Sequence, residues 1–249
     1  MTTKGHNQAK DLRGHKRKRT KPMTKTLKIA IDGPSGAGKS SLAKGVAAKL
    51  GLTYVDTGAL YRTVGLFAIR NGVDAADKAG IIALLPSLTV EMTNENGAQH
   101  VYLCGEDVTD KIRTPEVSHY ASSVSAVPEV RKFLFSLQRE IADKRDVIMD
   151  GRDIGTVILP DADLKVFLTA SAEARARRRY AELTEKGIKT SVEELIAQQN
   201  ERDARDSGRD VAPLTPADDA VFLDNSQISL AETIDEVIRL AREKQLTAK

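Results

Sequence analysis

Eight consecutive residues near the start of the chain have the types and spacing to hold a phosphate chain: Gly33-Pro34-Ser35-Gly36-Ala37-Gly38-Lys39-Ser40. They fit the pattern G-x-x-x-x-G-K-[ST], whose glycines let backbone N–H groups approach phosphate oxygens. Lys39 can reach the β- and γ-phosphates, and the Ser40 hydroxyl can ligate Mg²⁺. The helix that follows, with Ser41 in its first turn, directs the positive end of its dipole to the same place. These residues predict nucleotide binding, and a glycine-rich turn without a ligand is the alternative.

Three classes of protein share such a loop: small-molecule kinases, GTPase switches and ATPase motors. A GTPase needs a guanine-reading N-K-x-D segment, which this sequence lacks. A motor is usually larger and has a long apolar strand that ends in two carboxylates. Here Val147-Ile148-Met149-Asp150 ends in one acid followed by Gly-Arg-Asp. The kinase class is favoured because several arginines are placed to bind a second phosphorylated molecule.

A kinase for a phosphorylated acceptor must bring two polyanions together, so it needs cations on both sides and between them. Arg62 lies about one turn after Thr57, which could face a ligand or cap a helix. Another expected strand ends in an Asp-Gly-Arg-Asp turn. There Asp150 could hold Mg²⁺ through water, Arg152 offers a fork for phosphate, and Asp153 could accept from an exocyclic amine. The alternatives are a plain N-cap with an exposed arginine and a purely structural turn.

Residues 171–206 form a long charged segment that begins with arginines at 175 and 177–179. One interpretation is a solvated helix, and the other is a mobile hairpin that closes over a site. For a solvated helix we expect two i,i+4 ion pairs, Glu201–Arg205 and Arg202–Asp206. For a closing lid we expect flexible joints at Gly187 and at Ser207-Gly208.

The elements that must position these residues alternate between strands and helices. Short apolar runs predict five parallel strands, at 27–31, 52–55, 147–149, 164–168 and 220–223. Helical periodicity predicts helices after the phosphate loop, from about residue 60, and at 115–125, 128–144 and 230–240. Two further strands, 88–92 and 100–104, flank a hairpin signal at 94–97. The pattern predicts a three-layer α/β domain with an antiparallel insertion between its second and third core strands.

Composition limits the remaining possibilities. The chain of 249 residues is 41% apolar, enough for a sizeable core, and has no apolar run long enough to span a membrane. Its single cysteine, Cys104, cannot form an internal disulfide, so we expect a reducing, cytoplasmic setting. Aromatic residues make up only 4%, and none is Trp, which argues against a base-stacking nucleic-acid platform.

The net charge of +3 conceals a basic tail and a mildly acidic body. Residues 1–21 hold eight Lys or Arg against one acid, so the tail carries +7 and the remainder −4. We expect residues 1–24 to be disordered, because they are polar and basic and lack apolar periodicity. The tail is interpreted as a solvated extension, with an RNA-binding or nuclear-targeting patch as the alternative. The body is a poor electrostatic match for a nucleic-acid duplex.

Over residues 25–246 the sequence resembles the bacterial-type cytidylate kinase family. The segments that carry the resemblance are Ile31–Ser40, Asp56–Arg62, Gly105–Val108 with Ile112-Arg113, Asp150–Val157, and Arg202-Asp203 followed by Arg205-Asp206, Arg209 and Ala212–Leu214. Together, the stretches Asp-Gly-Pro-Ser-Gly-Ala-Gly-Lys and Asp-Gly-Arg-Asp-Ile-Gly-Thr are specific to this family. Thr57 stands where many members have serine, and both side chains carry a hydroxyl.

The resemblance implies a P-loop kinase fold made of three parts. A core with a five-stranded parallel sheet would comprise 25–57, 144–183 and 214–249, an NMP-binding insertion with a small antiparallel sheet 58–143, and a helical lid about 184–213. It implies that residues 33–41 bind ATP and that Ser40 and Asp150 bind Mg²⁺. The catalytic residues it implies are Lys39, Arg152 and Arg209. The substrate-binding residues it implies are Thr57, Tyr61, Arg62, Ser122, Arg131, Arg152, Asp153, Arg202, Asp206 and Arg209.

By role, the resemblance assigns residues to the CMP phosphate (Arg62 and Arg152), the cytosine (Ser122, Arg131 and Asp153), the sugar (Arg202 and Asp206) and the transferring phosphoryl group (Arg209). The implied reaction is the ATP- and Mg²⁺-dependent conversion of CMP or dCMP to CDP or dCDP by a cytoplasmic monomer. The alternatives are another phosphate-loop kinase, such as one for UMP, and an RNA-associated protein that acts through the basic tail.

Overall fold

The computed structural model describes residues 26–95 and 98–247, so the predictions for the basic tail lie outside the described residues. A five-stranded parallel sheet forms the centre, in the order β2-β6-β1-β7-β8. Its strands are β1 (Lys28–Asp32), β2 (Thr53–Asp56), β6 (Val147–Asp150), β7 (Leu164–Thr169) and β8 (Val221–Asp224). All five predicted strands are therefore confirmed, with ends that differ by no more than one residue.

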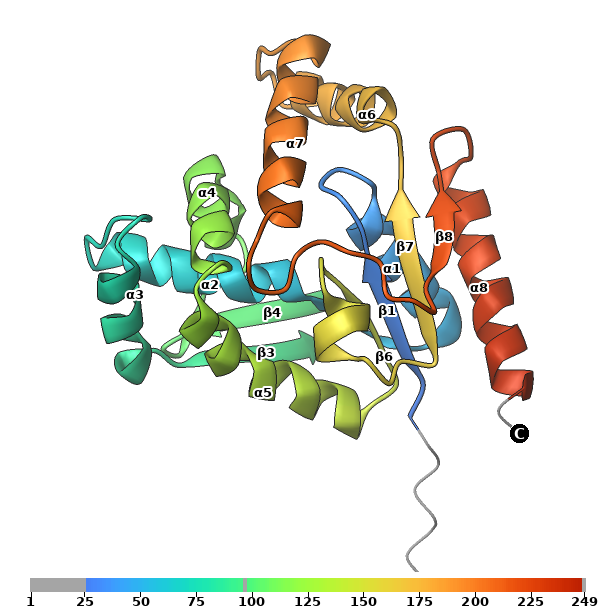
Figure 1. Ribbon diagram of the computed structural model, residues 1–249, viewed down its shortest axis with the longest axis horizontal. Coiled ribbons are helices and arrows are strands. Elements are labelled where there is room, and N and C mark those ends of the chain that lie inside the picture. Colours follow the sequence, from blue (N-terminus) through green and yellow to red (C-terminus); the bar gives the residue numbers. More distant parts are fainter. Residues whose placement is uncertain (1–25, 96–97, 248–249) are drawn as a thin grey trace, which may run out of the picture.

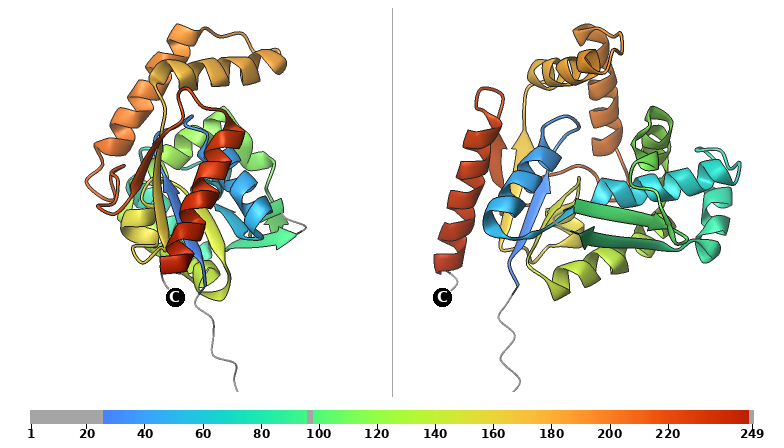
Figure 2. Two further views of the ribbon diagram at one scale, coloured as in Figure 1. Left: turned by 90° about the vertical axis from the view of Figure 1, so that its right-hand side faces the viewer. Right: turned by 180° about the vertical axis from the view of Figure 1, so that it is seen from behind.

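Helices cover both faces of the sheet, which makes the three predicted layers (Figures 1 and 2). Helices α1 (Lys39–Leu50) and α8 (Leu230–Thr247) bury their apolar sides on one face. They approach closely, because a β-carbon at Gly45 of α1 would lie 2.2 Å from Cδ1 of Ile234 in α8. The other face is covered by α5 (Pro128–Lys144) and by a short π-helical turn, Ile154–Ile158.

An insertion between β2 and β6 has its own apolar core. It comprises α2 (Thr57–Arg70), α3 (Lys78–Leu84), a 3₁₀ turn (Leu85–Ser87), the antiparallel strands β3 (Val90–Glu95), β4 (Ala98–Leu103) and β5 (Glu106–Asp107), a second 3₁₀ turn (Lys111–Arg113) and α4 (Pro115–Val124). The predicted antiparallel pair and both helices that follow it are confirmed. The short elements α3 and β5 were not predicted.

Two helices that cross at a steep angle, α6 (Ala172–Glu185) and α7 (Val192–Ser207), connect β7 to β8 (Figure 1), and we call them the helical arm. The arm stands above the carboxyl ends of the strands (Figure 1), where parallel sheets bind their ligands. The chain turns between the helices at Gly187, which has a φ of 70°. Ser191 and Glu194 then begin α7 with a capping box. In the described part of the chain, no helix is long and apolar enough to cross a membrane.

Candidate active site

The predicted phosphate loop connects β1 to α1 at the carboxyl end of the sheet. Gly36 and Gly38 have φ angles of 77° and 89°, which favour glycine and let successive N–H groups turn inward. The Lys39 ammonium donates a hydrogen bond to the Pro34 carbonyl at 2.6 Å, so the loop curls around its own lysine. Burial, followed by the charge of nearby Arg152, lowers the pKa of Lys39 well below its ordinary value. A phosphate beside Lys39 would oppose both effects and favour its charged form.

Asp150, the last residue of β6, lies directly beside this loop. Its carboxylate accepts hydrogen bonds from the Ser40 hydroxyl and the Tyr54 hydroxyl, each at 2.9 Å. Burial, followed by the charge of Asp56, raises the pKa of Asp150 to about 6. Tyr54 was not among the predicted site residues, because its role depends on the pairing of β2 with β6.

The oxygens of Ser40 and Asp150 fit the requirements of Mg²⁺. Mg²⁺ prefers hard oxygen ligands and keeps several waters, so it is usually held by one or two protein groups together with substrate phosphates. The two predicted metal residues are already in hydrogen-bond contact at 2.9 Å. Among the described residues, no group of three or more His, Cys, Asp or Glu could hold a metal ion alone. This arrangement suits a metal that arrives with a nucleotide.

A cavity of about 380 Å³ extends from the phosphate loop to the insertion and the helical arm. Every predicted catalytic and substrate-binding residue lines it: Lys39, Thr57, Tyr61, Arg62, Ser122, Arg131, Arg152, Asp153, Arg202, Asp206 and Arg209. Of the predicted nucleotide-binding residues, Ser35, Gly36, Gly38, Lys39, Ser40 and Ser41 line it, whereas Gly33, Pro34 and Ala37 do not. The structure thus brings together side chains from the core, the insertion and the arm.

Three arginines, Arg152, Arg202 and Arg209, gather around one buried carboxylate, Asp206. Arg152 Nε donates to Asp206 Oδ2 at 2.8 Å, and Arg209 pairs with the other oxygen. The ion pair expected between Arg202 and Asp206 is therefore wrong, because Asp206 turns toward the cavity. The expected Glu201–Arg205 pair is present at 3.6 Å. Burial, followed by the charge of Arg152, lowers the pKa of Arg202 to about 10.

Arg131 and Asp153, which also line the cavity, form a buried pair. Arg131 also donates to the Ser125 carbonyl at 3.2 Å, and its guanidinium lies 5.6 Å from the centre of the Tyr61 ring. Burial raises the pKa of Asp153, and the charge of Arg131 opposes this shift. The pair presents an acceptor and a donor side by side, a pattern that suits a base with an adjacent amine and ring nitrogen. Ser122, on α4, lines the same cavity.

Asp56 orients the arginines of the insertion. Its carboxylate accepts from Arg113 at 2.9 Å, from Arg62 at 3.4 Å and from the Ala59 N–H at 3.0 Å. The N-cap of α2 is therefore Asp56, and the prediction that Thr57 could cap this helix is wrong. The Thr57 hydroxyl donates to the Asp150 carbonyl at 2.9 Å. Burial alone would raise the pKa of Asp56, but the charges of Arg62 and Arg113 hold it below its ordinary value.

Asp32 holds the turn that carries Arg152 and Asp153. It is the last residue of β1, and its two carboxylate oxygens accept the N–H groups of Ile154 at 2.8 Å and Gly155 at 2.7 Å. Sequence reasoning missed this role, although an acid at the end of a buried strand was the available signal. The link joins the phosphate loop, which begins at the next residue, to the turn after β6.

Comparison with known proteins identifies the family. The family model for cytidylate kinase matches residues 29–243, which is most of the chain. The chain belongs to the cytidylate kinase family. Cytidylate kinase membership makes it a nucleoside-monophosphate kinase that acts on small nucleotide substrates, and it excludes the GTPase-switch and motor classes.

Three curated cytidylate kinases show how close the similarity is. The cytidylate kinase of Caldicellulosiruptor bescii is 48% identical over 216 residues, which cover 87% of this chain and 96% of the relative. That of Geobacter sulfurreducens is 48% identical over 219 residues, covering 88% and 94%. That of Lactobacillus johnsonii is 44% identical over 225 residues, covering 90% and 98%. Each of these three relatives is matched over nearly its whole length.

Proposed function

We propose that this protein transfers the γ-phosphoryl group of ATP to CMP and dCMP, which yields ADP with CDP or dCDP. One observation carries the proposal: a single cavity is lined both by the phosphate loop and by the buried Arg131–Asp153 pair. Arg62, Arg152 and Arg209 line the same cavity. A donor phosphate chain and a phosphorylated pyrimidine can therefore bind there together, with cations to neutralise both.

In this proposal, ATP binds through residues 33–41. The N–H groups of the loop and the Lys39 ammonium hold the donor phosphates, and Ser40 and Asp150 hold Mg²⁺ with its waters. Bound Mg²⁺ supplies charge neutralisation on the donor phosphates. Asp150 is already oriented for this task by the Tyr54 hydroxyl, 2.9 Å from its second oxygen.

The acceptor binds across the insertion, residues 58–143, and the arm. Arg62 and Arg152 hold the CMP phosphate as bidentate forks, and Arg202 with Asp206 contacts the sugar. In the structure, Arg152 donates a hydrogen bond to Asp206 at 2.8 Å. The phosphate of CMP therefore competes with Asp206 for Arg152. We propose that this exchange of partners accompanies closure of a lid, about residues 184–213, that turns at Gly187 and at Ser207-Gly208.

Cytosine is distinguished from uracil by Asp153 and Arg131. Asp153 accepts from the 4-amino group of cytosine and opposes the 4-carbonyl of uracil, while Arg131 donates to N3 or O2. Tyr61 keeps the Arg131 guanidinium in place through its ring, 5.6 Å away. Each mispaired buried polar group costs about 1–3 kcal/mol, so CMP should exceed UMP in kcat/KM by about tenfold or more.

The chemical step needs no strong general base, because the attacking phosphate oxygen of CMP is already ionised at neutral pH. Catalysis comes from alignment of the two substrates and from neutralisation of charge by Lys39, Arg152 and Arg209. Arg209 reaches the transferring group from the end of the arm, where Asp206 now pairs with it.

A coupled assay of ADP release with CMP, dCMP, UMP, AMP and GMP as acceptors tests the proposal. We expect CMP and dCMP to be used best, with UMP at least about tenfold lower in kcat/KM. Equal use of UMP, or a preference for a purine nucleotide, would contradict the assigned base contacts.

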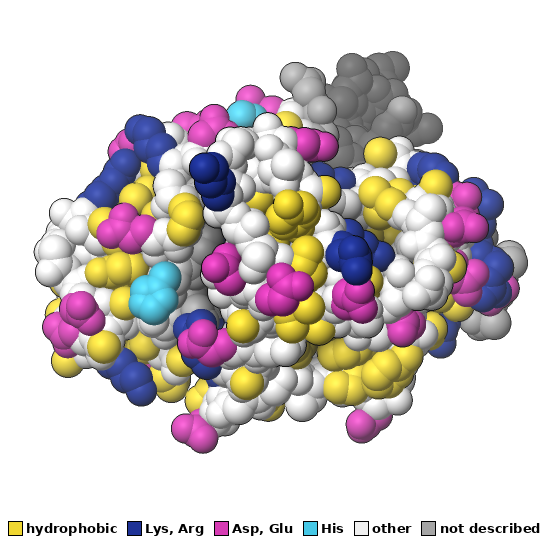
Figure 3. Space-filling model, turned by 90° about the horizontal axis from the view of Figure 1, so that it is seen from above, with side chains coloured by type: hydrophobic (Ala, Val, Ile, Leu, Met, Phe, Trp, Pro, Cys, Tyr) yellow, Lys and Arg dark blue, Asp and Glu magenta, His cyan; other side chains and the backbone are white. Residues whose placement is uncertain are grey.

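The alternative of an RNA-associated protein that acts through its basic tail is disfavoured by the family match, which covers residues 29–243 and not the tail. On the face seen from above, Lys or Arg and Asp or Glu side chains are intermixed (Figure 3), whereas RNA binding favours a continuous basic face. Deletion of residues 1–22 separates the two functions. The kinase should keep its turnover, and loss of turnover would point to the tail.

A further inference from the structure

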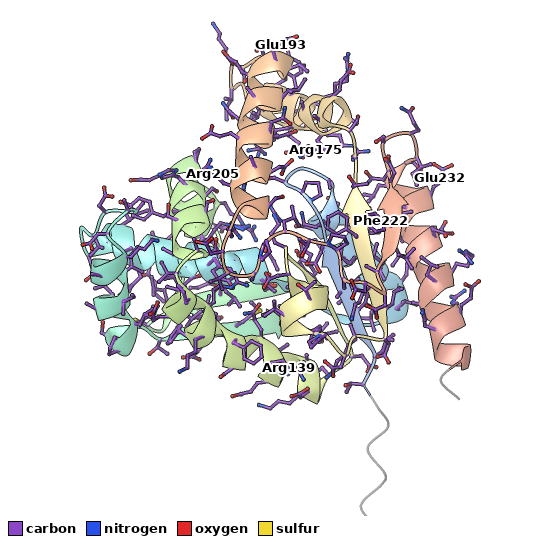
Figure 4. The ribbon with its side chains drawn as sticks, viewed as in Figure 1. Arg139, Arg175, Glu193, Arg205, Phe222 and Glu232 are labelled. Atoms are coloured by element: carbon purple, nitrogen blue, oxygen red, sulfur yellow. The ribbon has the colours of Figure 1, made fainter. Side chains whose placement is uncertain are left out.

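Two residues outside the predicted site, Arg175 of α6 and Asp203 of α7, attach the arm to the phosphate loop. Asp203 Oδ1 accepts a hydrogen bond from the Ser35 N–H at 3.1 Å, and its Oδ2 accepts from Arg175 Nη1 at 2.6 Å. The same Nη1 donates to the Ser35 carbonyl at 2.7 Å, and Arg175 Nε donates to the Ala170 carbonyl at 3.1 Å. Figure 4 shows Arg175 at the base of the arm, far from Glu193 at its tip.

This contact is buried and packed. Arg175 is only 6% exposed, and its charge is matched by Asp203. The neighbouring turn of the loop also packs against both helices, because a β-carbon at Gly36 would lie 3.1 Å from Gln199 Nε2 and 3.4 Å from Arg175 Cβ. Both polar groups of the Ser35 backbone are therefore engaged by the arm.

Two other residues of α7, Arg202 and Asp206, line the cavity. Arg202 precedes Asp203, and Asp206 lies about one turn further, so a shift of the helix at Asp203 moves both side chains. Arg209 follows the helix and pairs with Asp206. A helix fixed to the loop at Asp203 thus holds these groups at a set distance from the donor phosphates.

We infer that Asp203 and Arg175 are positioning residues that hold α7 in register with the phosphate loop, so that its acceptor-facing groups meet the transferring phosphoryl group. This role rests on the proposed function. Neither residue touches the reacting atoms, and each acts through Ser35 on one side and through α7 on the other.

Steady-state kinetics of Asp203→Ala, with Glu201→Gln as the matched control, test the inference. Glu201 lies on the same helix, is exposed, and has an ion pair with Arg205 at 3.6 Å. We expect Asp203→Ala to lower kcat with CMP by about tenfold or more, while KM for ATP stays within about threefold, because register matters most in the transition state. Asp203→Asn, which keeps an acceptor for the Ser35 N–H, should recover part of kcat.

Hydrogen exchange supplies a readout that does not depend on the acceptor. Amides of α7 should exchange about tenfold faster in Asp203→Ala, and those of α8 should not change, because the hydrogen bonds lost with Asp203 hold α7 and not α8. Unchanged exchange in α7 would contradict the claim that Asp203 attaches α7 to the phosphate loop. Faster exchange with unaltered kcat would contradict the positioning role of Asp203. A wild-type protein that does not phosphorylate CMP would refute the proposed function. The exchange result would still show whether Asp203 attaches α7 to the phosphate loop.

Discussion

Arg152 Nε donates to Asp206 Oδ2 at 2.8 Å, across 54 residues of sequence, and so joins the turn after β6 to the last turn of α7. Both residues also line the cavity, and residues of the phosphate loop form another part of its wall. A pair that spans the core and the arm can report on acceptor binding, because a phosphate that takes Arg152 must release Asp206. Binding of the acceptor phosphate and the position of the arm should therefore depend on each other.

The arm should respond to ligands. Without nucleotides, amides in residues 175–209 should exchange faster than they do with both substrates or a bisubstrate mimic, because closure adds contacts between α7 and the acceptor. Hydrogen exchange in the two states provides the measurement, with α8 as an internal reference. Equal protection of this segment in both states would argue against a lid.

Lys39→Ala should abolish phosphoryl transfer while leaving the fold intact. The ammonium is expected to contribute about 3 kcal/mol or more to transition-state stabilisation, which is about a hundredfold or more in kcat/KM. Turnover and a thermal melt should be compared with Lys49→Ala, because the Lys49 side chain is exposed and pairs with Asp235 of α8. A folded Lys39→Ala protein with near-normal turnover would remove the phosphate-loop assignment.

Asp153 and Arg62 should separate base reading from phosphate binding. Asp153→Ala should lower kcat/KM for CMP more than for UMP, so that the ratio between them moves toward one. Arg62→Ala should slow both substrates alike, because a phosphate contact carries no information about the base. Kinetics of both variants with both substrates give the answer. An unchanged ratio in Asp153→Ala together with an altered ratio in Arg62→Ala would reverse these roles.

Asp32 should make stability depend on pH. Burial raises its pKa from 3.8 to about 6, against the opposing effect of the Gly155 and Ile154 N–H groups, and Asp153 and Lys39 are the charges that act on it. Because the native state binds the proton more tightly, this stabilisation is complete below about pH 4 and is lost as pH rises through 6.

The Asp32→Asn variant has no titrating group at this position. Its comparison with the wild type therefore isolates the contribution of Asp32 to the pH dependence of stability. The free energy of unfolding of the wild type, relative to Asp32→Asn, should fall by about 3 kcal/mol at most between about pH 4 and pH 7. Urea unfolding of both proteins across this range measures the difference. A difference that is constant or that grows with pH would contradict a raised pKa for Asp32 in the native state.

The parts of the fold that could be predicted are those encoded in short stretches of sequence. The strands are apolar runs, and the phosphate loop has a complete local pattern, so both were found from the residues alone. Helix α3 has only 7 residues and one buried position, Ile81, which gives too little periodicity to detect. Strand β5 has 2 residues and is defined by its partner, β4.

Residues of the site that were missed act through contacts between distant segments. Asp32 meets Gly155 across 123 residues, and Ser35 meets Asp203 across 168. For a solvated helix, Asp206 was expected to pair with Arg202, because i,i+4 spacing is the only pairing signal that a sequence gives within a helix. It pairs instead with Arg209 and with Arg152, and the second of these comes from another element and depends on the placement of the arm over the sheet.

Product analysis tests the central claim most directly. The wild-type protein should be incubated with ATP, Mg²⁺ and CMP, and the nucleotides then separated and quantified by chromatography. We predict that CDP and ADP form in equal amounts, and that replacing CMP with UMP lowers kcat/KM by about tenfold or more. ADP without CDP, or no reaction with CMP under conditions that support turnover of UMP, would contradict the account.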